Sequence, residues 1–314
     1  MINKNILIRC DASQTIGLGH ITRCLVLANE FKKSGNNIIF AIKNNELAIE
    51  KIKDEQFDMI IASDDNFDYF KWIVDIIEQQ KIDIFIGDIR DGFPIELISY
   101  MKNKNILTVA IDEPSDYAKE CDICFYPPHA IIDKTKYKGK VYQGLEYVIL
   151  RPEFYEKFEK VKNEIPNVLV MMGGTDAYNL SYEVVKNLYK SNKEIKISVI
   201  LNQEHPDYHR IINISKNISI FSNVKNMANF LSKIDYAIIT FGMSVYEMLI
   251  MNIPSVHICL NEEHYVASNY FYLNEYAKKY RIKDIDKIVI NDKKIDISLN
   301  QSENIKKRIL DAVV

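Results

Sequence analysis

The sequence predicts an α/β protein made of two Rossmann-like domains, each with a parallel sheet. Short apolar strands alternate with longer amphipathic helices along the chain, which is the pattern of βαβ units. The pattern restarts after Pro166, and 314 residues suffice for two domains of about 150 residues each. Because ligands of such sheets bind at the carboxyl ends of the strands, we expect two facing sheets with the ligand in the cleft between them.

The first half supplies the strands and helices of one domain. Apolar β-branched runs predict strands, and apolar residues at helical spacing predict helices. Helices are expected between the strands, for example from Tyr69 to Gln79 and from Pro94 to Lys102. The strands are expected near 5–10, 37–42, 57–62, 83–88, 105–111, 121–125 and 141–149.

A charged segment separates the two halves. Residues 151–166 are rich in Glu and Lys, and we expect a helical linker there. The predicted domains are therefore 1–150 and 151–314. The strands of the second domain are expected near 167–172, 195–201, 217–221, 235–240 and 254–259.

Composition excludes several classes of protein. A net charge of −3 argues against a nucleic-acid-binding surface, which needs a basic excess. No apolar run reaches about 18 residues, so no membrane span is expected. The N-terminal residues lack the features of a signal peptide, which predicts a cytoplasmic protein with reduced cysteines. The pattern leaves the oligomeric state open between monomer and dimer.

The first candidate site follows the first predicted strand. Its loop contains Asp11, Gly17 and Gly19, and a helix then begins with His20 and Arg23. Glycines let the backbone approach a ligand at a helix N-terminus, where free N–H groups favour anions. A histidine placed there can exchange protons near neutral pH. The alternative is a histidine that only caps or packs the helix. The spacing matches neither the dinucleotide fingerprint nor the Walker loop.

The second candidate site consists of two glycine turns, each directly after a predicted strand. Their backbone N–H groups, with a serine hydroxyl, would face a phosphate. The residues are Gly173, Gly174 and Thr175 in one turn and Gly242, Met243 and Ser244 in the other. Glu247 follows inside the next helix, where its carboxylate can accept the hydroxyls of a ribose. The alternative for Glu247 is a capping box with Ser244.

These motifs together resemble the PseG/SpsG family, the UDP-sugar hydrolases of pseudaminic acid biosynthesis and their spore-coat relatives. The resemblance covers nearly the whole chain. The matching pieces are Ile16 to His20, Arg23, Leu25 to Ala28, Ile111-Asp112, Tyr137 to Gly139, Leu150 to Phe154, Met172 to Asp176 and the helix of Glu247.

The resemblance implies a GT-B fold related to that of the MurG glycosyltransferase. It also implies cleavage of the anomeric C1–O bond of a UDP-linked amino sugar, releasing UDP and free sugar for a pseudaminic acid-like surface glycan. In this reaction His20 would be the general base that removes a proton from water. Asp11 and Arg23 would be partners of either the sugar or His20.

The nucleotide half of the implied site lies in the second domain. The two glycine turns would stabilise the diphosphate, so neither a cofactor nor a catalytic metal is expected. The uracil would lie against Val224 and Met227, with Glu247 on the ribose. The expected partner is a UDP-sugar substrate.

The sugar half departs from the family pattern. Asp88-Ile89-Arg90 stands where the family has Asp-His-Tyr, which makes Asp88 and Arg90 candidate sugar-side residues. His129 and His264 also lie in altered segments, and each is either a new ligand contact or a loop-packing residue. Two other functions stay open: a GT-B glycosyltransferase that uses a UDP-sugar, and a non-catalytic nucleotide-sugar-binding subunit.

Overall fold

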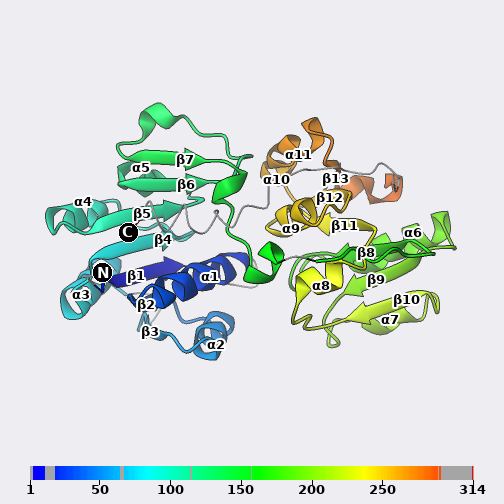
Figure 1. Ribbon diagram of the computed structural model, residues 1–314, viewed down its shortest axis with the longest axis horizontal. Helices are drawn as coiled ribbons and strands as arrows, with labels where there is room; N and C mark the ends of the chain where they lie inside the picture. The colour runs from blue at the N-terminus through cyan, green and yellow to red at the C-terminus, as the bar shows by residue number, and fades with distance from the viewer. Residues whose placement is uncertain are drawn as a thin grey trace. The chain divides into compact units, whose positions relative to one another are not determined.

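The chain forms two compact units that divide between Arg151 and Pro152. The computed structural model describes residues 3–10, 18–63, 67–113, 115–156, 158–288, 290 and 313 (Figure 1). Each unit is a parallel sheet flanked by helices, so the predicted fold class is confirmed. Val313, near the C-terminus, packs in the core of the first unit.

The first unit contains a seven-stranded sheet in the order β3-β2-β1-β4-β5-β6-β7, with all neighbours parallel. Its strands are β1 (Asn5–Cys10), β2 (Asn37–Ile42), β3 (Asp58–Ile61), β4 (Ile84–Asp88), β5 (Leu107–Ile111), β6 (Ile123–Tyr126) and β7 (Lys140–Gln143). Its helices are α1 (Gly19–Lys33), α2 (Glu46–Asp54), α3 (Tyr69–Gln80), α4 (Glu96–Asn103) and α5 (Asp116–Glu120). Two short 3₁₀ turns also occur, Lys134–Lys136 and Leu145–Tyr147.

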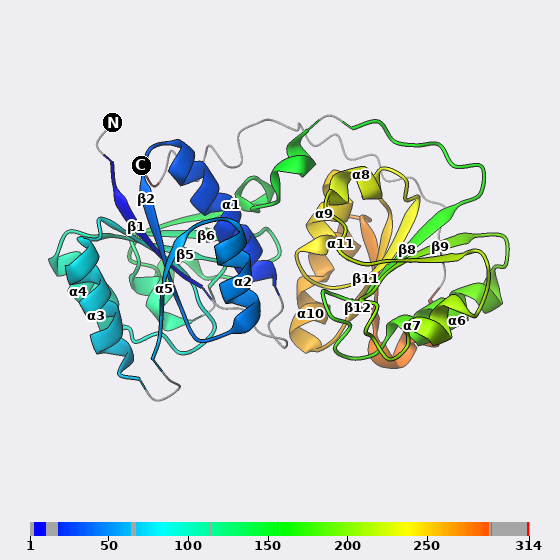
Figure 2. The ribbon, with the colours of Figure 1, turned by 90° about the horizontal axis from the view of Figure 1, so that it is seen from below.

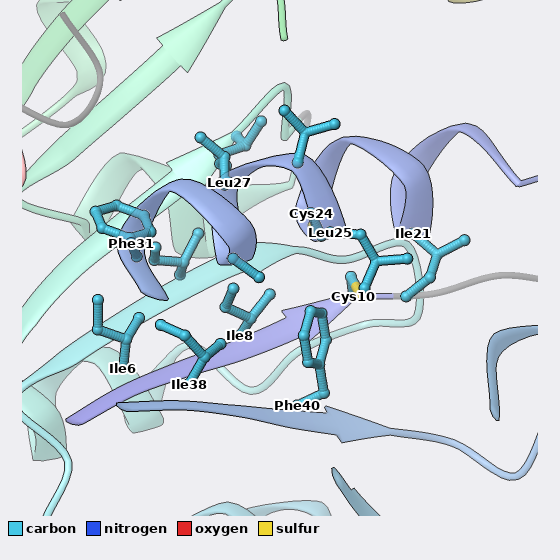
Figure 3. Close-up of a cluster of buried hydrophobic side chains, with 14 of the residues drawn as sticks. Ile6, Ile8, Cys10, Ile21, Cys24, Leu25, Leu27, Phe31, Ile38 and Phe40 are labelled. Atoms are coloured by element: carbon cyan, nitrogen blue, oxygen red, sulfur yellow. The ribbon is translucent and has the colours of Figure 1, made fainter. Parts of the chain in front are cut away.

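The central strand β1 is covered on both faces, which explains its nearly continuous apolar sequence. Ile6 and Ile8 lie on the face of β1 that α1 covers and share one core with Leu27 and Phe31 (Figure 3), while Leu7 belongs to the core on the opposite face. The first core also contains residues of α2, and the second contains residues of α3, α4 and α5 (Figure 2). Because α1 is packed along β1 in this way, the residues at the start of α1 are held at the carboxyl end of the sheet.

The second unit contains a six-stranded parallel sheet in the order β10-β9-β8-β11-β12-β13. Its strands are β8 (Asn167–Met171), β9 (Lys196–Ile200), β10 (Ile218–Phe221), β11 (Tyr236–Thr240), β12 (Ser255–Cys259) and β13 (Ala277–Arg281). Its helices are α6 (Ser181–Ser191), α7 (Tyr208–Ile212), α8 (Met227–Leu231), α9 (Ser244–Ile250), α10 (Glu262–Ala267) and α11 (Asn269–Leu273). The 3₁₀ turns Pro152–Tyr155 and Ile282–Lys287 belong to this unit.

Both sheets reverse their strand order at one place. In the first sheet the chain builds outward from β1 and then returns to place β4 on the other side of β1. In the second sheet β8 and β11 are related in the same way. Ligands of open α/β sheets bind at the carboxyl ends of the strands at such reversals. The first candidate site follows β1, and the two glycine turns of the second follow β8 and β11.

Two of the expected elements are wrong. The strand expected at 141–149 ends at Gln143, because the chain turns there and brings Tyr147 onto the ring of Phe125. The expected helical linker contains only the 3₁₀ turn Pro152–Tyr155, and no helix occurs at 158–166. Instead, the Val161 amide donates to the Ser232 carbonyl, and the Asn163 side chain bonds to Asp235. These contacts with the second unit replace the hydrogen bonds of a helix.

Strand β13 is absent from the expected set. Its sequence carries Lys278, Lys279 and Arg281, which hide the apolar alternation of an edge strand. In the structure the cationic groups of Lys279 and Arg281 lie 3.7 and 3.5 Å from the centre of the Tyr265 ring. Cation–π contacts therefore replace part of the apolar burial that normally marks a strand.

No helix in the described ranges combines the length and the hydropathy needed to cross a bilayer.

Gly139 marks a close approach of backbone segments at the start of β7. Its neighbours donate hydrogen bonds on both sides, Lys138 N to the Lys119 carbonyl and Lys140 N to the Asp122 carbonyl. A Cβ atom at this position would lie 2.2 Å from the Cys121 carbonyl oxygen. Backbone must therefore shift to admit any other residue.

We expect Gly139→Ala to lower the free energy of unfolding by about 1–3 kcal/mol, the usual cost of overpacking. Denaturant unfolding measures it. Gly242→Ala is the matched control, because a Cβ there meets nothing within 4 Å. Equal losses in the two variants would show that the backbone clash is not the cause.

Candidate functional site

The carboxyl end of the first sheet brings His20 against Asp88. His20 is the second residue of α1, and Asp88 is the last residue of β4, the neighbour of β1. The His20 Nδ1 atom lies 2.7 Å from Asp88 Oδ1. The Asp88 side chain is fully buried, whereas that of His20 is 17% exposed. His20 does not cap α1, whose N-cap is Leu18 without a side-chain hydrogen bond.

Arg23 binds the same carboxylate from one helical turn further along α1. Its Nε and Nη2 atoms donate to the two oxygens of Asp88 at 2.5 and 2.6 Å. Its Nη1 atom donates to Asp112 Oδ2 at 2.9 Å. Arg23 is only 6% exposed, so this is a buried, two-pronged ion pair of the strong kind. Arg23 therefore pairs with both Asp88 and Asp112.

The charges of the pair fix the protonation of Asp88. Burial alone would raise the pKa of Asp88, but the positive charge of Arg23 and the hydrogen bonds from Arg23 and His20 outweigh it. The pKa of Asp88 therefore lies well below its usual range. Burial in turn would lower the pKa of Arg23, yet Asp88 and Asp112 raise it well above its usual value. Asp88 is an ionised carboxylate.

An ionised Asp88 determines which nitrogen of His20 carries the hydrogen. A carboxylate can only accept, so the short contact requires Nδ1–H on the imidazole. Arg23 Nη2 also lies 3.1 Å from Nδ1, but the contact of Nδ1 with the carboxylate is shorter, and two acceptors at 2.7 Å with no hydrogen between them would repel each other. In the neutral ring the lone pair is then on Nε2. This arrangement presents a proton acceptor with a fixed orientation.

The loops after β4 and β5 continue the network. Arg90 donates to the Asp112 carbonyl and, at 3.2 Å, to Glu113 Oε2. Glu113 is buried and also accepts from the Ile89 amide at 3.2 Å. Asp112 and Glu113 were given no role from the sequence. The signal that points to them is two carboxylates directly after an apolar strand, β5, that pairs with β4.

The opposite face of the loop after β4 is held by a second buried arginine. Arg9 is fully buried at the end of β1, donates to the Tyr69 hydroxyl at 2.8 Å and forms an ion pair with Asp91. The loop is thus fixed through Asp88 and Arg90 on one side and through Asp91 on the other.

Of the predicted first-unit residues, His20, Arg23, Asp88 and Arg90 lie in one network, and Gly19 begins α1. Asp11 and Gly17 lie outside the described residues.

In the second unit the two glycine turns follow neighbouring strands, β8 and β11. Gly173 has φ +78°, a conformation that suits glycine. A Cβ atom on Gly173 would lie 3.6 Å from Thr240 Oγ1, which places the two turns side by side. A Cβ atom on Gly174 or on Gly242 would meet nothing within 4 Å, so backbone is accessible at both. Thr175 is exposed in the same turn.

A buried aspartate supports the first of these turns. Asp176 accepts from the Leu180 and Ser181 amides at 2.8 and 2.9 Å, at the beginning of α6. Its own backbone has φ +48°. The last residue of the Gly-Gly-Thr-Asp motif therefore orients the turn, while the first three face outward.

Glu247 lies in the first turn of α9, one turn past Ser244. The capping-box alternative is wrong, because Ser244 is the first helical residue, the N-cap is Met243 and no side chain caps the helix. Glu247 is 9% exposed. Val224 and Met227 follow β10, two strands from β8, half-buried and buried respectively. All the predicted nucleotide-side residues thus follow the carboxyl ends of strands in one sheet.

Three further histidines, His257, His264 and His129, lie in different surroundings. His257 is fully buried between the hydroxyls of Ser255 and Ser268, and burial lowers its pKa to about 3, so it is structural. His264 packs on the Phe241 ring, and its buried Nδ1 atom has no hydrogen-bond partner in the described part of the chain. His129 is half-buried in the loop after β6. The described residues contain no group of three or more potential metal ligands.

Comparison with known sequences finds distant relatives. No protein-family model matches the chain. An uncharacterised protein of Methanocaldococcus jannaschii is 33% identical over 282 residues. The match covers 82% of this chain and 56% of that protein, so this chain spans little more than half the length of that relative. The UDP-2,4-diacetamido-2,4,6-trideoxy-beta-L-altropyranose hydrolase of Campylobacter jejuni is 23% identical over 286 residues, 88% of this chain and 99% of the hydrolase. The spore coat polysaccharide biosynthesis protein SpsG of Bacillus subtilis is 22% identical over 270 residues, 82% and 78% of the two chains.

Comparison with solved structures identifies the fold. MurG of Acinetobacter baumannii has a TM-score of 0.72 at 13% identity, with 99% of each chain covered. UGT89C1 of Arabidopsis thaliana has a TM-score of 0.68 at 9% identity, with both chains fully covered. The chain therefore has the GT-B fold, and its distant relatives include this Campylobacter jejuni hydrolase and SpsG.

We expect Asp88→Asn to lower the free energy of unfolding near neutral pH by about 3–5 kcal/mol, because Arg23 loses its buried counter-charge. The folded chain holds the pKa of Asp88 below that of the unfolded chain. The stability from Asp88 is therefore full above about pH 4 and is lost as the pH falls toward the folded pKa. Denaturant unfolding of parent and variant across this range measures the difference. A difference that does not shrink in acid would contradict the assignment of an ionised Asp88.

Proposed function

We propose that the chain is a UDP-sugar hydrolase that cleaves the anomeric C1–O bond of a UDP-linked acetamido sugar. The observation that carries the proposal is the 2.7 Å contact between His20 Nδ1 and the ionised Asp88, which leaves Nε2 as a fixed proton acceptor. The Campylobacter jejuni relative, named as a UDP-sugar hydrolase, aligns over 99% of its length and supports the same reaction. The name of SpsG supports a role in polysaccharide biosynthesis. We propose that the free sugar is used to make a pseudaminic acid-like surface glycan.

In this mechanism His20 Nε2 removes a proton from the water that attacks C1. The imidazole becomes positively charged, and the adjacent Asp88 carboxylate stabilises that charge. Arg23 keeps Asp88 ionised and in place, so it is a positioning residue. We assign the sugar to the first unit, with Gly19 and Arg90 and the sequence-predicted residues Asp11 and Gly17 as its candidate contacts.

The leaving group of the reaction is UDP, assigned to the second unit. Accessible backbone at Gly173, Gly174 and Gly242 would donate N–H groups to the diphosphate, with the hydroxyls of Thr175 and Ser244 beside them. Met243 separates Gly242 from Ser244 in the second turn. Glu247 would accept the ribose hydroxyls, and Val224 would contact the uracil. Stabilising the charge that develops on the diphosphate makes UDP a better leaving group.

A panel of UDP-sugars tests the reaction directly. The panel includes UDP-2,4-diacetamido-2,4,6-trideoxy-beta-L-altropyranose, and the incubation is done in heavy-oxygen water. Phosphorus NMR follows UDP release, and mass spectrometry locates the label. The proposal requires label at C1 of the free sugar and none in UDP. UDP release only on addition of an alcohol would instead identify a glycosyltransferase, and UDP-sugar binding without release would identify a binding subunit.

We expect His20→Asn to lower turnover by about 10²- to 10⁴-fold, the usual contribution of a general base. UDP affinity should not change, because the nucleotide is assigned to the other unit. Initial rates and calorimetry measure these quantities. His209→Asn, an exposed position on α7, is the control. Parent-like turnover in His20→Asn would remove His20 from the mechanism.

We expect Glu247→Ala to weaken UDP binding by about 1–3 kcal/mol, the cost of leaving paired polar groups unmatched. Calorimetric titration with UDP gives the affinity. Glu183→Ala, an exposed glutamate on α6 that pairs with Lys186, is the matched control and should bind UDP as the parent does. Equal UDP affinity in Glu247→Ala and the parent would exclude Glu247 from the nucleotide site.

A further inference from the structure

Asp112 is the most exposed carboxylate among the linked side chains His20, Asp88, Arg23 and Asp112, which we call the ion network. Its side chain is 28% exposed, compared with 6% for Arg23 and none for Asp88. It directly follows β5, and β5 pairs with β4, whose last residue is Asp88. Asp112 is therefore joined to His20 through two buried residues and still reaches the surface at the same edge of the sheet.

The backbone of Asp112 is held in an uncommon conformation. Its φ of +49° lies in the left-handed region, which non-glycine residues seldom adopt. The Asp112 amide donates to the Phe125 carbonyl at 2.8 Å, which fixes this conformation against β6. Residues in such conformations cluster at ligand-binding and active sites.

The two oxygens of the Asp112 carboxylate differ. Oδ2 accepts from Arg23 at 2.9 Å and lies 3.8 Å from Arg90 Nη2. Oδ1 accepts no hydrogen bond from the described residues. A carboxylate is an acceptor only, so the group that complements Oδ1 must be an N–H or O–H donor.

The surrounding charges restrict that donor further. Asp88, Asp112 and Glu113 supply three carboxylates, and Arg23 and Arg90 supply two guanidinium groups. Among the described residues of this network, carboxylates outnumber guanidinium groups by three to two. This set of charges repels an anionic group and accepts a neutral or cationic one. Hydroxyl, amino and acetamido groups of a sugar satisfy this requirement, whereas a phosphate does not.

We propose that Asp112 Oδ1 binds the sugar of the substrate by accepting a hydrogen bond from one of its N–H or O–H groups. The proposal rests on the proposed UDP-sugar reaction and adds a specificity-determining contact to it. It also links recognition to the base, because Arg23 bridges the carboxylates of Asp112 and Asp88. The UDP portion makes no contact with Asp112.

Asp112→Asn is the informative variant. The amide oxygen can keep the hydrogen bond from Arg23, and the amide NH₂ then takes the place of Oδ1. A donor thus faces the donor on the sugar, while the partner of Arg23 is retained. Asp122→Asn is the matched control, because Asp122 is a partly exposed aspartate at the amino edge of the same sheet, bonded to Thr108.

The test measures the affinities for UDP-2,4-diacetamido-2,4,6-trideoxy-beta-L-altropyranose and for UDP by calorimetry. Both are measured in the His20→Asn background, which keeps the UDP-sugar intact. We expect Asp112→Asn to weaken binding of the UDP-sugar about 10- to 100-fold, as for loss of a hydrogen bond to a charged group, and to leave UDP affinity unchanged. Asp122→Asn should change neither affinity.

The outcomes separate the two proposals. Unchanged UDP-sugar affinity in Asp112→Asn overturns the contact, and equal weakening of UDP overturns its assignment to the sugar. With His20 present, a fall in kcat at constant KM would make Asp112 a positioning residue only, which also overturns the contact. A parent that binds neither UDP nor the UDP-sugar refutes the proposed function and the contact together.

Discussion

The buried ion pair between Arg23 and Asp88 is the constraint on which the first-unit site depends. Two charges removed from water are tolerated only when each is matched by its partner and by further hydrogen bonds. Asp88 accepts two hydrogen bonds from Arg23 and one from His20, and Arg23 also donates a hydrogen bond to Asp112. The pair therefore fixes three things together: the position of α1 against β4, the charge of Asp88 and the orientation of His20.

The two units use one structural principle for different chemistry. Each places its candidate residues after strands at the point where the strand order reverses, β1 and β4 in the first sheet and β8 and β11 in the second. The first unit fills this position with buried, paired charges that orient one histidine. The second leaves it open, with accessible backbone at Gly174 and Gly242. A paired charge network suits proton transfer, and accessible backbone suits binding of a diphosphate.

The sequence predicts the strands well because most are buried on both faces and read as apolar runs. It misses β13, whose cations pack on Tyr265, and mistakes residues 158–166 for a helix because their contacts with the second unit are not visible in the pattern. His20 and Arg23 are found because they are close in sequence. Their contacts with Asp88 and Asp112 span 65 to 89 positions and depend on strand order, which composition and spacing do not supply.

The central claim is that Asp88 holds His20 as the Nδ1–H tautomer with Nε2 free to accept a proton. Nitrogen NMR of the protein with isotope-labelled histidine measures this directly, because protonated and unprotonated ring nitrogens have different chemical shifts. The His20 signals are assigned by comparison with His20→Asn. At a pH where the ring is neutral, we expect a protonated Nδ1 and an unprotonated Nε2. A neutral His20 with its hydrogen on Nε2 would contradict the account.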